Sequence, residues 1–197
     1  MEIAGRHDTR CHLCKSKIYS LLGLIHGAIE FKFKATGVSV ELPTYLDTEA
    51  YSALKEIYQA LVSIRGYDNF VNAKTLQRCD LFVPASGTVV ELDEIQHFTE
   101  ARAVALMNYP QSLAVGFDKA AYIERCQRLR RRDNDPKYPY RDEQRAWYDT
   151  LRDFLPVLLP RLVRTPTVRI PLGSHSWCSL DVKEASHVDS FRVLTGL

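Results

Sequence analysis

The alternation of apolar and polar residues is clearest at residues 79–98, where it predicts two short strands joined by a turn. Residues 81–83 form an apolar run, which Pro84 and the turn signal Ala-Ser-Gly close. A second β-rich run begins at Thr88. We therefore expect a hairpin here, with the other elements placed around it.

Apolar residues recur at helical spacing in other segments, and short alternating runs lie between them. Gly37 supplies a turn between two such runs, so a separate side hairpin is expected there. We predict helices over residues 15–29, 48–63, 99–107, 118–132 and 141–155, and strands over residues 30–34, 38–42 and 167–172.

The length and composition favour a single domain. With 197 residues, of which 46% are hydrophobic and 25% charged, the chain can bury one full core. Within this domain we distinguish an N-terminal helix and hairpin extension (1–45), a first core half with the central hairpin (46–110), a basic helical insertion (111–140) and a second core half with the tail (141–197).

The chain has no apolar run of about eighteen residues, and its first residues lack the basic-then-apolar order of a signal peptide. Its cysteines number five, and this odd number fits reduced thiols better than a disulfide framework. We therefore expect a soluble, cytoplasmic protein that has no membrane partner.

Cys11 and Cys14 form one Cys-x-x-Cys pair, with His7 and His12 beside it. Thiolate and imidazole ligands at this spacing can begin a tetrahedral zinc site, but no second pair follows. Zinc would need one of these histidines and a distant group such as Cys79, Cys126 or Cys178. We expect free cysteines and keep a structural zinc site as the alternative.

A net charge of +2 gives no global attraction for a polyanion, so any surface for nucleic acid must be local. The end of the helix over residues 118–132 carries a dense arginine cluster: Arg125, Arg128, Arg130, Arg131 and Arg132. These side chains could grip phosphates, or they could form a solvated helix end that complements the helix dipole. The next candidates for a grip are Lys32, Lys34 and Lys74.

Acidic residues gather on the central hairpin. Glu91 and Asp93 lie two residues apart, so the alternation of side chains in a strand puts both on one face. Asp80, at the start of the preceding strand, can meet them across the hairpin. Three converging carboxylates resist ionisation unless a divalent cation neutralises them, which predicts a magnesium-type site. The alternative is the solvated face of an antiparallel hairpin.

The run Asp80-Leu-Phe-Val-Pro, a turn, and Val-Val-Glu-Leu-Asp-Glu-Ile-Gln-His-Phe98 resembles the core of PD-(D/E)XK nucleases, and most closely the branch of the very-short-patch repair endonucleases. The resemblance implies an α/β fold with a restriction-endonuclease-like αβββαβ core, in which helices flank a mixed sheet. Asp80 matches the metal-binding aspartate and Glu91 the second acid. Asp93 falls where the superfamily has its lysine, and Gln96 with His97 matches a polar pair.

The activity implied is that of a metal-dependent DNA endonuclease that uses magnesium or manganese. Asp80 and Glu91, with the Leu92 carbonyl, would hold the cation, and Asp93 could be a further ligand. His97 is the best candidate to orient or deprotonate the attacking water, because its ordinary pKa lies near neutrality. Because an acid stands in the lysine position, the resemblance does not identify the group that activates water.

Gln96 could donate a hydrogen bond to a phosphate oxygen, and the helix over residues 141–155 offers Gln144 and Arg145 as second-rank candidates. DNA is the expected partner, and a homodimer is left open. Two other functions remain possible on the same residues: a non-catalytic DNA-binding module of nuclease fold, and a metal-dependent phosphodiesterase that acts on RNA or a nucleotide.

Overall fold

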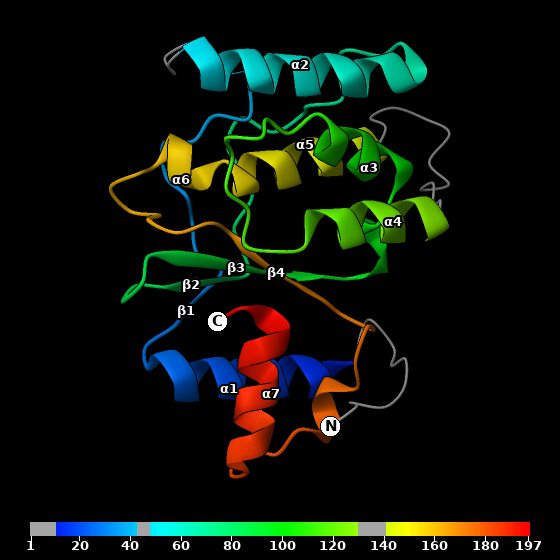
Figure 1. Cartoon of the computed structure of the whole chain (residues 1–197). Coiled ribbons are helices and arrows are strands. Elements are labelled where there is room, and N and C mark those ends of the chain that lie inside the picture. The colour runs from blue at the N-terminus through cyan, green and yellow to red at the C-terminus, as the bar shows by residue number, and fades with distance from the viewer. Residues whose placement is uncertain (1–10, 43–47, 130–140) are drawn as a thin grey trace.

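The structure is a computed structural model that describes residues 11–42, 48–129 and 141–197. A four-stranded sheet runs through the middle, in the order β1 (Glu30–Phe31), β2 (Leu81–Val83), β3 (Thr88–Asp93) and β4 (Val168–Pro171). β2 is antiparallel to both of its neighbours, β1 and β3, and β4 runs parallel to β3. The expected α/β class, with helices flanking a mixed sheet, is therefore confirmed (Figure 1).

Two helical layers cover the two faces of the sheet (Figure 1). α1 (His12–His26), the short 3-10 helix η2 (Trp177–Ser179) and α7 (Ala185–Thr195) lie below it in the view. The other side holds α2 (Thr48–Arg65), α3 (Glu100–Met107), α4 (Lys119–Leu129), α5 (Arg141–Asp153) and α6 (Leu155–Leu158), with α2 outermost. Each layer has its own apolar core.

β3 lies between these two cores, and all of its residues are buried. Val90 and Leu92 face the core of α1 and α7, whereas Val89 belongs to the core on the other face. Because successive side chains alternate, Glu91 and Asp93 point the same way as Val89, toward α5. Two carboxylates are thus directed into a protein interior rather than into water.

The central hairpin and the strand over residues 167–172 form as the sequence predicts, but the side hairpin does not. β1 pairs with β2, and the ladder continues as Lys32 N–H donates to the Asp80 carbonyl at 2.9 Å. Within the second predicted strand of that hairpin, Ser39 instead bridges Thr75. The prediction was wrong because β2 offers a long-range partner, which local alternation cannot reveal.

The predicted helices are present where the structure describes them, with small shifts at their ends. α1 begins earlier than expected, because the Cys11 sulfur caps the helix by accepting from Cys14 N–H at 3.4 Å. Thr99 caps α3 through its hydroxyl, which accepts from Arg102 N–H at 3.1 Å. None of the described helices is both long enough and apolar enough to cross a membrane.

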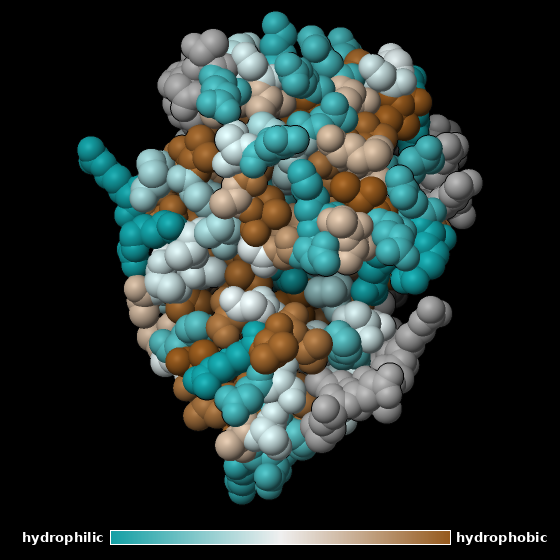
Figure 2. Space-filling view, in the orientation of Figure 1, coloured by the Kyte–Doolittle hydropathy of each residue, from teal (hydrophilic) through white to brown (hydrophobic). Residues whose placement is uncertain are grey.

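The visible surface mixes hydrophilic and hydrophobic residues, with apolar patches between polar ones (Figure 2). Leu24, Val193 and Leu194 are among the large apolar side chains that remain exposed. The net charge of the chain is only +2. Any attraction for a charged ligand must therefore come from a few local groups.

Candidate active site at the end of the central hairpin

Asp80 and Glu91 meet across the central hairpin, as the sequence predicts. The antiparallel register pairs Leu81 with Val90, so the next residues outward are Asp80 and Glu91. Asp80 N–H donates to Glu91 Oε1 at 3.1 Å, and Leu92 N–H donates to Asp80 Oδ2 at 2.9 Å. Each carboxylate is therefore held by the backbone of the opposite strand.

The backbone carbonyl of Leu92 points toward the same edge. The Asp93 carbonyl accepts from Leu172 N–H at 2.8 Å, on the side of β4. Backbone groups of successive strand residues point to opposite edges, so the Leu92 carbonyl is directed toward β2 and Asp80. Two carboxylates and one carbonyl are thus brought to one place. Such hard oxygen ligands fit magnesium or manganese.

Burial changes the protonation of this pair. The Glu91 side chain is 5% exposed, whereas that of Asp80 is 29% exposed, so solvent reaches the pair from the Asp80 side. Burial raises the pKa of Glu91 to about 7, against the opposing effect of the Arg152 guanidinium. Arg152 Nε lies 3.5 Å from Glu91 Oε2. The Glu91 carboxyl therefore exchanges its proton near neutral pH.

Asp93 does not join this pair. Its two carboxylate oxygens lie 2.9 and 3.0 Å from Arg169 Nη1, and Tyr122 donates its hydroxyl hydrogen to Oδ2 at 3.1 Å. Among the described residues, Asp80, Glu91 and Asp93 do not form a cluster that could hold a metal ion. The expected convergence of three carboxylates is therefore corrected: an arginine from β4 neutralises the third acid.

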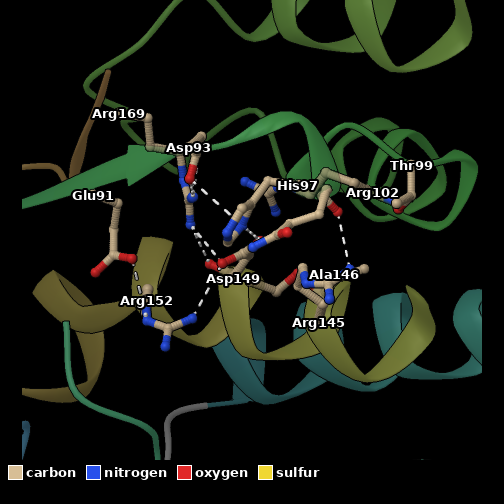
Figure 3. A network of polar contacts seen from close by, with 12 residues as sticks. Glu91, Asp93, His97, Thr99, Arg102, Arg145, Ala146, Asp149, Arg152 and Arg169 are labelled. Atoms are coloured by element: carbon tan, nitrogen blue, oxygen red, sulfur yellow. Dashed lines mark hydrogen bonds and ion pairs between the residues drawn. The ribbon is translucent and has the colours of Figure 1, made fainter. Parts of the chain in front are cut away.

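Arg169 is the centre of a buried charged network (Figure 3). Its Nε lies 2.7 Å from Asp153 Oδ1, and its Nη2 donates to the Asp149 carbonyl at 3.1 Å. Arg152 joins Asp149 to Glu91, and Arg102 lies 2.6 Å from Asp153 Oδ2. In all, the guanidiniums of Arg102, Arg152 and Arg169 face the carboxylates of Glu91, Asp93, Asp149 and Asp153, all of them buried.

His97 belongs to this network. Its Nδ1 lies 2.8 Å from Asp149 Oδ2 and 3.6 Å from Asp93 Oδ1. Burial lowers the pKa of His97, but the two carboxylates outweigh it and the net shift is upward. When His97 is protonated and Glu91 is ionised, four cations face four carboxylates. Its expected role toward water stays a prediction, because the contacts of Nδ1 lead into the network and not to Asp80.

Gln96, Gln144 and Arg145 have contacts that fasten α5 to its surroundings. Gln144 Nε2 donates to the Phe70 carbonyl at 2.6 Å and to Asn72 Oδ1 at 2.8 Å. Arg145 Nη1 donates to the Gln96 carbonyl at 3.0 Å. These contacts position the segments before β2 and after β3. Catalytic roles for the three side chains stay predictions.

The arginine cluster is only partly described. Arg125 Nη2 donates to the Leu172 carbonyl at 3.1 Å, and its guanidinium lies 4.1 Å from the centre of the Phe98 ring. Arg125 therefore holds α4 against the sheet. Arg128 is exposed. Arg130, Arg131 and Arg132 lie outside the described residues, so the choice between phosphate grip and solvated helix end stays open.

Lysine side chains flank the acid pair, and the sequence did not place them there. Lys32 Nζ lies 3.5 Å from Asp80 Oδ1, and Lys15 of α1 forms an ion pair with Glu94. Lys34 and Arg78 are both exposed and flank the hydrogen bond from Cys79 N–H to the Phe33 carbonyl at 2.8 Å. The only signal was the Lys-Phe-Lys alternation at residues 32–34, which gives a face but not its neighbour.

Cys11 and Cys14 lie at the start of α1, on the other side of the sheet from the charged network. Cys79 and Cys126 are buried in the core between the sheet and α3 to α5. His7 lies outside the described residues. The thiols of Cys11 and Cys14 are therefore separate from the acid pair, whereas the Cys79 thiol contacts Glu91, and burial raises its pKa.

No family model, no curated protein and no solved structure matches the chain. The functional argument therefore depends on the site itself.

The raised pKa of Glu91 predicts a pH-dependent stability. Its folded value of about 7 exceeds its ordinary value of 4.5, so the folded state binds this proton more tightly. The stability it contributes is complete at low pH and disappears as pH rises through about 7. Glu91→Gln stays uncharged, so its melting temperature should fall less than that of wild type between about pH 5 and about pH 8, with a chelator present. Identical pH dependence in both proteins would contradict the assignment.

The charged network predicts a large effect for Arg169→Met. The substitution leaves buried carboxylates without their main cation, and the free energy of unfolding should fall by about 3–5 kcal/mol. Arg161→Met, at an exposed arginine after α6, is the control and should change it by no more than about 0.5 kcal/mol. Urea denaturation followed by circular dichroism measures both. Equal effects would mean that Arg169 is not central to the network.

Proposed function

We propose that the protein is a magnesium- or manganese-dependent DNA endonuclease that hydrolyses phosphodiester bonds. The observation that carries this proposal is the meeting of Asp80 and Glu91 at one end of the hairpin, with the Leu92 carbonyl directed to the same edge. This set of oxygen ligands is the kind that a hard divalent cation needs.

The order of elements supports a restriction-endonuclease-like core. α1 precedes three antiparallel strands, and helices then lead to β4, which lies parallel to β3. This is the αβββαβ order that the resemblance implies, with α2 inserted between β1 and β2. The fold alone does not select a reaction, so the acid pair carries the functional argument.

Asp80, Glu91 and the Leu92 carbonyl would hold the cation at the end of the hairpin. When bound, magnesium would polarise the scissile phosphate and lower the pKa of a bound water. Glu91 binds its proton up to about pH 7, so it becomes a ligand at neutral and alkaline pH. Solvent and substrate would approach from the more exposed Asp80 side.

Lys32 would supply the ammonium group that the chain lacks at position 93, where it has an aspartate. Its ammonium group is exposed and lies 3.5 Å from Asp80 Oδ1, so it can donate to an oxygen of the reacting phosphate. Its backbone has a φ of 56°, a left-handed conformation that is unusual for a residue with a side chain. Such conformations are concentrated at functional sites, which supports a role in substrate contact.

The substrate backbone would lie along Lys32, Lys34 and Arg78. Lys32 and Lys34 follow β1 and Arg78 precedes β2, and all three are exposed. Lys32 N–H donates to the Asp80 carbonyl and Cys79 N–H to the Phe33 carbonyl, which brings the two segments together. Phosphate contacts of this kind fix the position of DNA without reading its sequence. Because the net charge is only +2, a surface that attracts DNA has to be local, and a basic strip formed by these residues would be such a surface.

The proposed cleavage is tested by nicking of supercoiled plasmid with and without magnesium. We expect nicking that needs the cation, and we expect Asp80→Asn or Glu91→Gln to reduce it by about 100-fold or more, since a bound cation stabilises the transition state by several kcal/mol. DNA binding should persist, because removing a carboxylate also reduces the repulsion of phosphate. Asp189→Asn, at an exposed acid on α7, is the matched control and should cleave like wild type.

Several results would contradict the proposal. Wild-type cleavage by Asp80→Asn would remove Asp80 from the site. Magnesium-independent binding without cleavage by the wild type would favour the non-catalytic DNA-binding module. Cleavage of RNA but not of DNA would favour the alternative phosphodiesterase.

The basic strip is tested by the salt dependence of DNA binding. Replacing Lys34 and Arg78 with alanine should weaken binding similarly for different sequences, and it should lower the slope of log affinity against log salt by about 0.9 for each phosphate that the variant no longer neutralises. The double control Lys55→Ala, Lys183→Ala removes the same charge from exposed sites on α2 and before α7. An equal change of slope in both variants would show a general charge effect and no local strip.

A further inference from the structure

Three cysteines converge on the face of the sheet that carries α1 and α7. The sulfur atoms of Cys11, Cys14 and Cys178 all lie within 4.8 Å of one another. Cys11 and Cys14 are at the start of α1, whereas Cys178 comes from η2, after β4. The fold thus supplies the distant third cysteine that the Cys-x-x-Cys pair lacked in the sequence.

The spacing suits a tetrahedral metal ion. Zinc–sulfur bonds of about 2.3 Å place two tetrahedral ligand sulfurs about 3.8 Å apart, so a shift of about 1 Å or less closes this cluster around a zinc ion. Sulfur ligands select soft or borderline ions such as zinc over magnesium and calcium. Cys14 is buried and the other two are half-buried, so the cluster is accessible from one side.

Neighbouring groups hold two of the sulfurs in place. Cys14 N–H donates to the Cys11 sulfur at 3.4 Å, and Ser176 Oγ lies 3.5 Å from the Cys178 sulfur. Hydrogen-bond donors around ligand atoms orient the ligands and stabilise their negative charge. The cluster therefore has hydrogen-bond donors around its sulfur atoms in addition to their short separations.

We propose that Cys11, Cys14 and Cys178 bind a structural zinc ion that ties the start of α1 to the segment after β4. Water or one further side chain completes the tetrahedron. The ion joins chain segments that are far apart in sequence, and because the site forms only in the folded chain, the free energy of zinc binding adds to the free energy of folding. It also fixes η2, whose Trp177 is 1% exposed and packs edge-on against Phe191 of α7 with ring centres 5.7 Å apart.

The proposal is separate from the proposed nuclease activity. The cysteines belong to the core of α1 and α7, whereas Glu91 faces the opposite core, toward α5. We assign a structural role to the ion, because the three ligands found among the described residues are all thiols, the ligand type of structural zinc sites. Zinc content and fold stability therefore test it, whether or not the protein cuts DNA.

Elemental analysis of the full chain, purified from zinc-supplemented cells without chelators, measures the metal. We expect about one zinc per chain, falling at least about tenfold in Cys178→Ser and in Cys11→Ser. Cys126→Ala is the matched control, because this buried cysteine lies in the other core, and it should keep its zinc. Wild type without zinc, or Cys178→Ser with full zinc, would overturn the proposal.

A second measurement covers variants that fail to fold. A chelator stronger than the site should lower the melting temperature of the wild type by several degrees, and it should make three more thiols reactive toward a disulfide reagent. Replacing zinc with cobalt should produce a thiolate-to-cobalt charge-transfer band. If mass spectrometry instead finds a disulfide between two of the three cysteines in protein purified under reducing conditions, the zinc assignment is wrong.

Discussion

The buried guanidinium of Arg169 is the interaction on which the arrangement of this protein depends. It comes from β4 and contacts Asp93 on β3 and both Asp149 and Asp153 on α5. Moving any of these elements by one position would leave a charge buried without its partner, at a cost of several kcal/mol. Arg169 thus fixes the parallel register of β3 and β4 and the position of α5 on the sheet.

The same interaction decides which acids can meet a ligand. Arg169 and Tyr122 donate hydrogen bonds to the carboxylate of Asp93, so this carboxylate is part of the buried network and does not face a ligand. Asp80 and Glu91 lie one step further out, where β2 begins and solvent reaches the pair. Arg152 touches both Glu91 and Asp149, so it links the outer pair to the network behind it. In the proposed function, the inner charges position the site and the outer carboxylates would hold the cation.

The two faces of the sheet are stabilised in different ways. The face toward α5 contains aromatic and aliphatic side chains together with the charged network. The opposite face carries a smaller apolar core under α1 and α7, and its three cysteines bring the start of α1 close to the segment after β4. A bound metal ion adds proportionally more stability to a small core, because a small core buries less apolar surface. A metal there would support the fold without touching the acid pair.

The sequence by itself determined what depends on neighbouring residues. The two strands of the hairpin, the contact of Asp80 with Glu91 and most helices follow from local periodicity and a tight turn. Only the tertiary structure decided what covers each face. Arg169 neutralises Asp93, β2 takes β1 as its partner in place of the expected side hairpin, and Cys178 reaches Cys11. The alternation of side chains along a strand predicts the face of the sheet to which each side chain points. The groups that meet it there come from segments far along the chain, and their arrival depends on how all the layers pack together.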